Sequence, residues 1–296
     1  MAHTPVLLQE VLEILSPQAG EVFLDGTVGS GGHALELSQK LGSTGHLICL
    51  DQDQSSLVKA KETLKGVKCK TSFHLANFRH LDKVLAELGL TQVDGILLDL
   101  GVHSDQIGPS GRGFSFMHDE PLLMTMKEGP TESDLTAKDV VNSWEEDNLV
   151  AILRGFGEET FAPAIAKAIV EARHEKDIET TGELVEIIRG AVPAWYTHKR
   201  LHFATRTFQA LRLAVNDELG ALKEGLTKGW ESLAPGGRFG VISFHSLESR
   251  LVKNFFRDKK GEGHNLLTKH AIQATREEEL SNPRSRSAEL RVIKKI

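Results

Sequence analysis

Two aspartates on either side of a glycine-rich stretch are the residues of this sequence whose types and spacing most suggest chemistry. Asp25 ends the apolar run "EVFLD", four glycines follow in "GTVGSGGH", and Asp51 ends the next apolar run, "HLICLD". A glycine turn between a strand and a helix can hold a nucleotide-type cofactor, because bare backbone and helix N-terminal amides then face the ligand. A strand-to-helix turn with only a structural role is the alternative interpretation.

The charges around this turn indicate which cofactor would fit. No Gly-Lys-Ser/Thr follows, so the stretch is not a triphosphate-binding loop. A carboxylate at Asp25 would repel a pyrophosphate, whereas S-adenosylmethionine carries an ammonium and a sulfonium. Asp51 lies about 20 residues beyond the loop, where a carboxylate accepts hydrogen bonds from ribose hydroxyls; a helix cap or strand-end turn is its alternative role. The pattern favours S-adenosylmethionine over NAD.

The two cysteines bear on what would be methylated. Methylation of a pyrimidine at C5 typically uses a cysteine thiolate that adds to the ring. Cys49 and Cys69 lie in the strand-like runs "HLICLD" and "VKCKTSF" and have the character of small sheet residues. An exocyclic amine or a hydroxyl, neither of which needs a covalent enzyme intermediate, is therefore the expected acceptor.

Two further residues are candidates for catalysis. Asp99 ends the apolar run "DGILLDL" and could accept hydrogen bonds from an amine as positive charge develops on it; capping a turn is the alternative. His245 follows a late apolar run in "SFHSLESR" and could contact the target base. Its alternative is a place at the start of a helix capped by Ser246.

Alternating apolar runs predict the elements that position these residues. Strand patterns at 21–25, 46–51, 67–73 and 94–100 alternate with helical patterns, which implies a parallel sheet covered by helices. The chain then becomes irregular and afterwards helical until one long helix at 205–233, a strand at 238–244 and a last strand candidate at 288–296. We therefore expect an α/β sheet domain formed by 1–108 and 203–296, interrupted by a helical insert at 109–202.

Composition narrows the class of protein. The 296 residues are 40% hydrophobic and carry a net charge of −6, and neither a signal peptide nor a membrane-spanning run is recognisable, so we expect a cytoplasmic protein that does not bind membranes. No HExxH, paired CxxC or calcium-loop pattern occurs, so no metal is expected. Basic clusters in the C-terminal third weakly favour a polyanionic partner.

Eight motifs in order resemble the MraW family of bacterial ribosomal RNA methyltransferases over nearly all of the chain. They are "HTPVLLQEVL", "FLDGTVGSGGH", "DGILLDLGVHSDQ", "RGFSF", "GEE", "ATRTFQALRLAVNDEL", "PGGRFGVISFHSLESRLVK" and "NPRSRSAELRV". The resemblance implies a class I (Rossmann-like) S-adenosylmethionine-dependent methyltransferase domain with an inserted helical domain that recognises RNA. It also implies methyl transfer to N4 of a cytosine in the decoding region of 16S rRNA, in the small ribosomal subunit.

The same resemblance implies a set of cofactor contacts drawn from four of the strand ends and loops. By motif they are Gly31, Gly32, His33, Asp51, Phe78, Asp99 and Gln106. A core position is the alternative for Phe78, because a phenylalanine at the start of a helix usually packs inside.

The sequence departs from the family pattern at two places. His103 stands where the family has a serine, and Leu123 and Thr125 stand where it has an acid and a base. If the missing pair was an internal salt bridge, losing both charges together is tolerable. If either residue of the pair contacted RNA, two other functions are the alternatives to rRNA methylation. One is a non-catalytic RNA-binding or ribosome-assembly factor, and the other is a methyltransferase that acts on DNA or protein. The exact nucleotide, the ribosome-assembly stage and the oligomeric state, a homodimer included, are left open.

Overall fold

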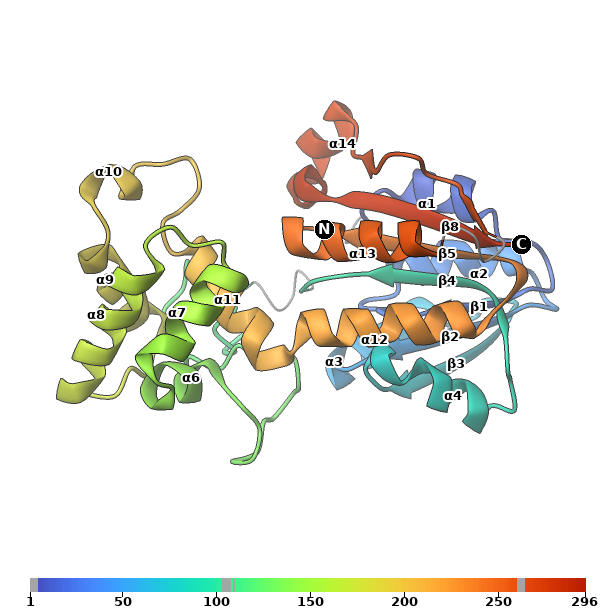
Figure 1. Ribbon diagram of the computed structural model, residues 1–296. Coiled ribbons are helices and arrows are strands. Elements are labelled where there is room, and N and C mark those ends of the chain that lie inside the picture. The colour runs from blue at the N-terminus through green and yellow to red at the C-terminus, as the bar shows by residue number, and fades with distance from the viewer. Residues whose placement is uncertain (1–4, 103–107, 109, 260–263) are drawn as a thin grey trace. The chain divides into compact units, whose positions relative to one another are not determined.

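The computed structural model describes residues 5–102, 108, 110–259 and 264–296, and the chain divides into two compact units (Figure 1). The first unit comprises Met1–Gly101 and Leu219–Ile296, and the second comprises Val102–Glu218. The second unit is thus inserted into the first, which holds both ends of the chain.

The first unit contains one sheet, and its strands follow the alternation read from the sequence. Within the described residues the order is β3-β2-β1-β4-β5-β8-β6, with β7 paired to β8. The first five strands are parallel, and β8 runs antiparallel to β5. The strands are β1 (Val22–Asp25), β2 (His46–Asp51), β3 (Lys70–Leu75), β4 (Val93–Asp99), β5 (Leu233–Ser243), β6 (His264–Leu266), β7 (Ile272–Gln273) and β8 (Glu289–Lys295).

Helices cover both faces of this sheet, because successive strand residues point to opposite faces. In β1, Phe23 packs in a core with the first three helices, while its neighbour Leu24 packs in a core with three others. The first group is α1 (Leu8–Leu15), α2 (Gly32–Leu41) and α3 (Gln54–Thr63). The second group is α4 (Leu81–Glu87), α12 (Glu218–Glu231) and α13 (Ser246–Asp258). The α/β class expected from the sequence is confirmed.

Short elements complete the first unit. They are the 3-10 turns η1 (Phe78–His80) and η2 (Pro283–Ser287) and the helix α14 (Arg276–Ser281).

The second unit is helical and has its own core. Its helices are α6 (Ala137–Ser143), α7 (Glu146–Gly155), α8 (Ala162–Glu175), α9 (Thr181–Ala191), α10 (Ala194–Thr197) and α11 (Thr205–Asn216). Their apolar sides form one cluster that includes Leu149, Ile165 and Leu211. Whether this unit recognises RNA stays a prediction.

The prediction of a single long helix at 205–233 is wrong, because the helix is interrupted at Asp217. Asp217 adopts left-handed backbone angles (φ 46°, ψ 44°) and ends α11, and its N–H donates to the carbonyl of Leu213. Aspartate tolerates this conformation better than most residues do, which allows α12 to start immediately afterwards at Glu218.

In the part of the chain that the structure describes, no helix combines the length and the apolar character that crossing a bilayer requires.

Candidate functional site at the carboxyl edge of the sheet

Three aspartates end three neighbouring strands at one edge of the sheet. β1, β2 and β4 are parallel, so Asp25, Asp51 and Asp99 all lie at the carboxyl edge. The chain order reverses between β1 and β4, which is the place where open α/β sheets bind ligands. Each aspartate stands two residues after a strand residue of the core under α1, α2 and α3, so the three side chains share that face.

Asp51 ties the glycine-rich turn to the end of β2. Its Oδ2 accepts the N–H of Gly29 at 2.9 Å, and its Oδ1 accepts the N–H of Asp53 at 2.9 Å. Asp53 in turn caps α3 by accepting the N–H of Ser55. The strand-end turn that the sequence offered as an alternative is therefore present. A role toward ribose hydroxyls stays a prediction, and carboxylate oxygens can each accept a second hydrogen bond.

Two glycines of the turn are needed for packing within the protein. Gly31 has φ 89°, and a Cβ there would lie 3.2 Å from Cβ of Thr63 and 3.3 Å from Cα of Ala60. A Cβ on Gly32 would lie 2.6 Å from Cγ of Pro5. The sequence suggested that a ligand required bare backbone here. The structure shows that protein neighbours also exclude a side chain at both positions, and these neighbours are too distant in the chain for the motif to reveal them. A contact of the two glycines with a cofactor stays a prediction.

His33 and Asp99 are neighbours beneath this turn. The His33 ring is buried, its Nε2 lies 2.9 Å from the carbonyl oxygen of Val6, and its Nδ1 lies 3.6 Å from Oδ2 of Asp99. A carbonyl only accepts, so Nε2 carries a proton, and Nδ1 faces the carboxylate. The backbone N–H of Asp99 donates to Oγ1 of Thr27 at 2.6 Å. Sequence analysis did not identify Val6 and Thr27 as the partners of His33 and Asp99.

Phe78 packs against α12 at the start of η1. A Cβ on Gly225 would lie only 2.5 Å from Cδ2 of Phe78, so the ring rests on the helix backbone. The side chain is half-buried against the core that α12 shares with the sheet. A contact with adenine stays a prediction. Gln106 and His103 lie outside the described residues.

His245 caps α13. Its Nδ1 accepts the N–H of Glu248 at 3.5 Å, and the Glu248 carboxylate accepts the N–H of His245 at 3.3 Å. Nε2 of the ring lies 3.1 Å from the other Glu248 oxygen. Capping is therefore observed, with His245 in the place that the sequence assigned to Ser246. Contact with a target base stays a prediction.

Both cysteines are buried and carry protonated thiols. Burial raises the pKa of Cys49 well above its usual value, and the neighbouring Asp25 carboxylate raises it further. Burial also raises the pKa of Cys69. A thiol held in this form is a poor nucleophile.

The residues at one departure from the family pattern belong to the interior of the second unit. The Thr125 side chain is 6% exposed and its Oγ1 accepts the N–H of Lys127, while Leu123 is half-buried. On either side of Thr125, the carbonyl of Met124 and the N–H of Met126 bond to the amide of Asn216, each at 2.8 Å. Asn216 therefore holds the backbone on either side of Thr125 in place.

Among the described residues, no group of three or more His, Cys, Asp or Glu side chains is arranged so that it could hold a metal ion.

Comparison with known proteins places this geometry in a family. The Ribosomal RNA small subunit methyltransferase H of Heliobacterium modesticaldum is 47% identical over 311 aligned residues, covering 99% of this chain and 98% of that protein. The protein of the same name from Syntrophotalea carbinolica is 44% identical, covering 99% and 98%. A solved structure from Clostridium thermocellum, titled as an rRNA-methylase, aligns over 100% of both chains at 12% identity with a TM-score of 0.49. The sequence profile of the MraW methylase family matches residues 1–296, and the chain belongs to this family.

Proposed function

We propose that this protein transfers a methyl group from S-adenosylmethionine to N4 of a cytosine in the decoding region of small-subunit rRNA. The observation that carries the proposal is the full-length membership of the MraW methylase family, together with relatives above 40% identity that are named as small-subunit rRNA methyltransferases. The chain is an S-adenosylmethionine-dependent methyltransferase of class I fold.

The residues at the carboxyl edge fit this cofactor. S-adenosylmethionine supplies an electrophilic methyl group on a positively charged sulfur. Asp25 and Asp51 are buried acids at the ends of β1 and β2, so they favour a cationic ligand and disfavour a pyrophosphate. The proposed contacts are the turn at Gly31–His33, the Asp51 carboxylate and the ring of Phe78.

Asp99 is the proposed proton-accepting group. The lone pair of an amine attached to a pyrimidine is delocalised, so the enzyme must align the amine and accept hydrogen bonds from its protons. The Asp99 side chain is 21% exposed, and its Oδ2 lies 3.6 Å from Nδ1 of His33. Its backbone bond to Thr27 fixes the strand end from which the carboxylate projects. The buried cysteines favour direct transfer without a covalent enzyme intermediate.

Substitution of Asp99 tests this assignment. Asp99→Ala and Asp99→Asn would each be assayed by calorimetry with S-adenosylmethionine and by methyl transfer to undermethylated small subunits. Retained cofactor affinity with methyl transfer reduced at least about a hundredfold supports a role in the chemical step. Loss of both reassigns Asp99 to cofactor binding. A wild-type protein that binds no S-adenosylmethionine would point instead to the non-catalytic assembly factor.

The second unit is the proposed rRNA-recognition domain. Its α10 exposes Trp195, which is 57% exposed, and Nζ of Lys199 lies 4.8 Å from the centroid of that ring. An exposed aromatic ring beside a cation is suited to stacking on an unpaired base. The adjacent Tyr196 is buried and belongs to the core.

A further inference from the structure

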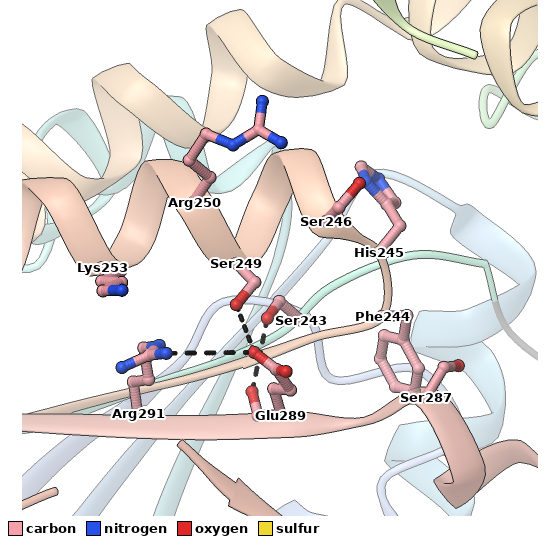
Figure 2. Close-up of a pocket in the computed structure, with 10 residues that line it drawn as sticks. All are labelled: Ser243, Phe244, His245, Ser246, Ser249, Arg250, Lys253, Ser287, Glu289 and Arg291. Carbon is pink, nitrogen blue, oxygen red and sulfur yellow. Dashed lines mark hydrogen bonds and ion pairs between the residues drawn. The ribbon is translucent and has the colours of Figure 1, made fainter. Parts of the chain in front are cut away.

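A pocket in the first unit shares His245 with the residues described above but none of the proposed cofactor contacts. It has a volume of about 460 Å³ and is formed where β5 ends, α13 begins and β8 starts (Figure 2). Its lining is polar and positively charged, with the cations Arg250, Lys253 and Arg291, the carboxylate of Glu289 and four serines.

The pocket opens on the opposite face of the sheet from the glycine-rich turn. Ile242 and Val292 pack in the core under α1, α2 and α3, and strand residues alternate between faces. Their neighbours Ser243 and Arg291 therefore point to the face covered by α13. Asp51, His33 and Asp99 gather on the other face, so the pocket is separate from the proposed cofactor contacts.

Arg291 offers donor capacity that the protein does not use. Its side chain is 14% exposed, and its Nε is buried with no hydrogen-bond partner among the described residues. Its terminal nitrogen reaches Oε2 of Glu289 only at 4.0 Å. Because the Nε atom is itself closed to solvent, an anion in the pocket would bind the guanidinium through its terminal N–H groups.

The carboxylate in the pocket is already engaged. Ser249 donates to Oε2 of Glu289, and Nε2 of Gln273 donates to its Oε1 at 3.4 Å. Figure 2 shows Ser243, Ser249 and Arg291 grouped around Glu289, while Arg250 extends away from this group. Lys253 is exposed on the next turn of α13 and has no ion-pair partner in the described part of the chain.

We propose that this pocket binds a backbone phosphate of the rRNA substrate through Arg291 and Lys253. Three cations line the pocket against one engaged carboxylate, which leaves net positive charge, and serine hydroxyls add neutral donors. The inference rests on the proposed function, and it places an RNA contact on the sheet unit itself, in addition to the inserted helical unit.

RNA binding at several salt concentrations tests the proposal. Fluorescence anisotropy with a labelled decoding-region RNA would compare wild type, Lys253→Gln, Arg291→Gln and the double variant. Lys40→Gln is the charge-matched control, because Lys40 is exposed at the far end of α2, near the amino end of β2. Thermal unfolding and S-adenosylmethionine affinity would verify folding, and Lys253→Gln carries the test if Arg291→Gln unfolds.

The expected result is specific to the pocket. Lys253→Gln and the double variant weaken RNA binding, the latter about tenfold. Their plot of log affinity against log salt becomes shallower by about 0.7 for a lost phosphate contact on a single strand. Cofactor affinity stays at the wild-type value, and Lys40→Gln matches wild type.

Three results overturn the proposal, and a fourth separates its failure from that of the proposed function. An unchanged salt slope in folded variants removes the phosphate contact. An equal loss of RNA affinity in Lys40→Gln would show that the effect reflects the overall charge of the protein and not the pocket. Binding of inorganic phosphate that the variants abolish, with RNA binding unaffected, makes the pocket a free-anion site. If wild type does not methylate rRNA, the proposed function fails whatever the variants show.

Discussion

Asp51→Asn is the substitution whose effect follows most directly from the structure. Each carboxylate oxygen of Asp51 accepts one backbone N–H, from Gly29 and from Asp53. Asparagine keeps one acceptor oxygen and replaces the other with an NH2 group, which would face an N–H donor. One charge-assisted bond is lost and one buried N–H loses its partner, for a cost of about 2–3 kcal/mol. For a unit of this size that lowers the melting temperature by about 5–10 °C.

The same change should weaken cofactor binding. The loop that Asp51 holds is the proposed cofactor contact, so we expect the dissociation constant for S-adenosylmethionine to rise about ten- to a hundredfold. Thermal unfolding and calorimetry measure the two effects. Asp53→Asn is the matched control, because it removes the same charge two residues later while asparagine caps a helix as well as aspartate. A melting temperature and an affinity indistinguishable from wild type in Asp51→Asn would refute the reasoning.

Four further outcomes are expected. The double variant Cys49→Ala/Cys69→Ala should keep methyl transfer within about threefold of wild type. The native protein should resist alkylation at pH 8, because burial raises the pKa of both thiols. A double variant that folds but does not transfer methyl groups would indicate covalent catalysis by a cysteine. His245→Asn replaces one N-cap with a better one and should keep the fold, so a loss of turnover beyond about threefold would support the predicted contact of the ring with the target base; unchanged turnover would leave capping as its role. Burial, with the hydrogen bond to Glu159, raises the pKa of Tyr196 from 10.0 to about 12, so wild type should lose stability as pH rises from about 10 to about 12. Tyr196→Phe should be destabilised by about 1–3 kcal/mol below pH 10 and lack that high-pH loss, as denaturant unfolding would show. Trp195→Ala should weaken RNA binding about tenfold without changing cofactor affinity, and equal binding would remove the stacking contact.

The sheet could be predicted because its strands are short apolar runs that end in aspartate or a turn. Runs such as "HLICLD" are too short for a typical helix and fit the buried interior of a parallel sheet, and β2 spans His46–Asp51 as expected. The edge strands β6 and β7, of three and two residues, were missed because so short a run has no periodicity to detect.

Tertiary contacts set the limits of the sequence interpretation at the site. The break at Asp217 interrupts a continuous helical pattern, and only the backbone angles reveal it. Gly32 and His33 depend on Pro5 and Val6, which lie at the start of the chain. The residue types in the sequence indicated that acids and glycines lie together at the carboxyl edge of the sheet. The residues that contact them were identified only from the structure.

The most direct test of the proposed reaction is nucleoside mass spectrometry of rRNA methylated in vitro. Purified protein would be incubated with undermethylated small subunits and S-adenosylmethionine carrying an isotopically labelled methyl group. We predict that the label appears as N4-methylcytidine at a single position in the decoding region and is absent with Asp99→Ala. Label at cytosine C5, in protein, or in no nucleoside at all would contradict the account.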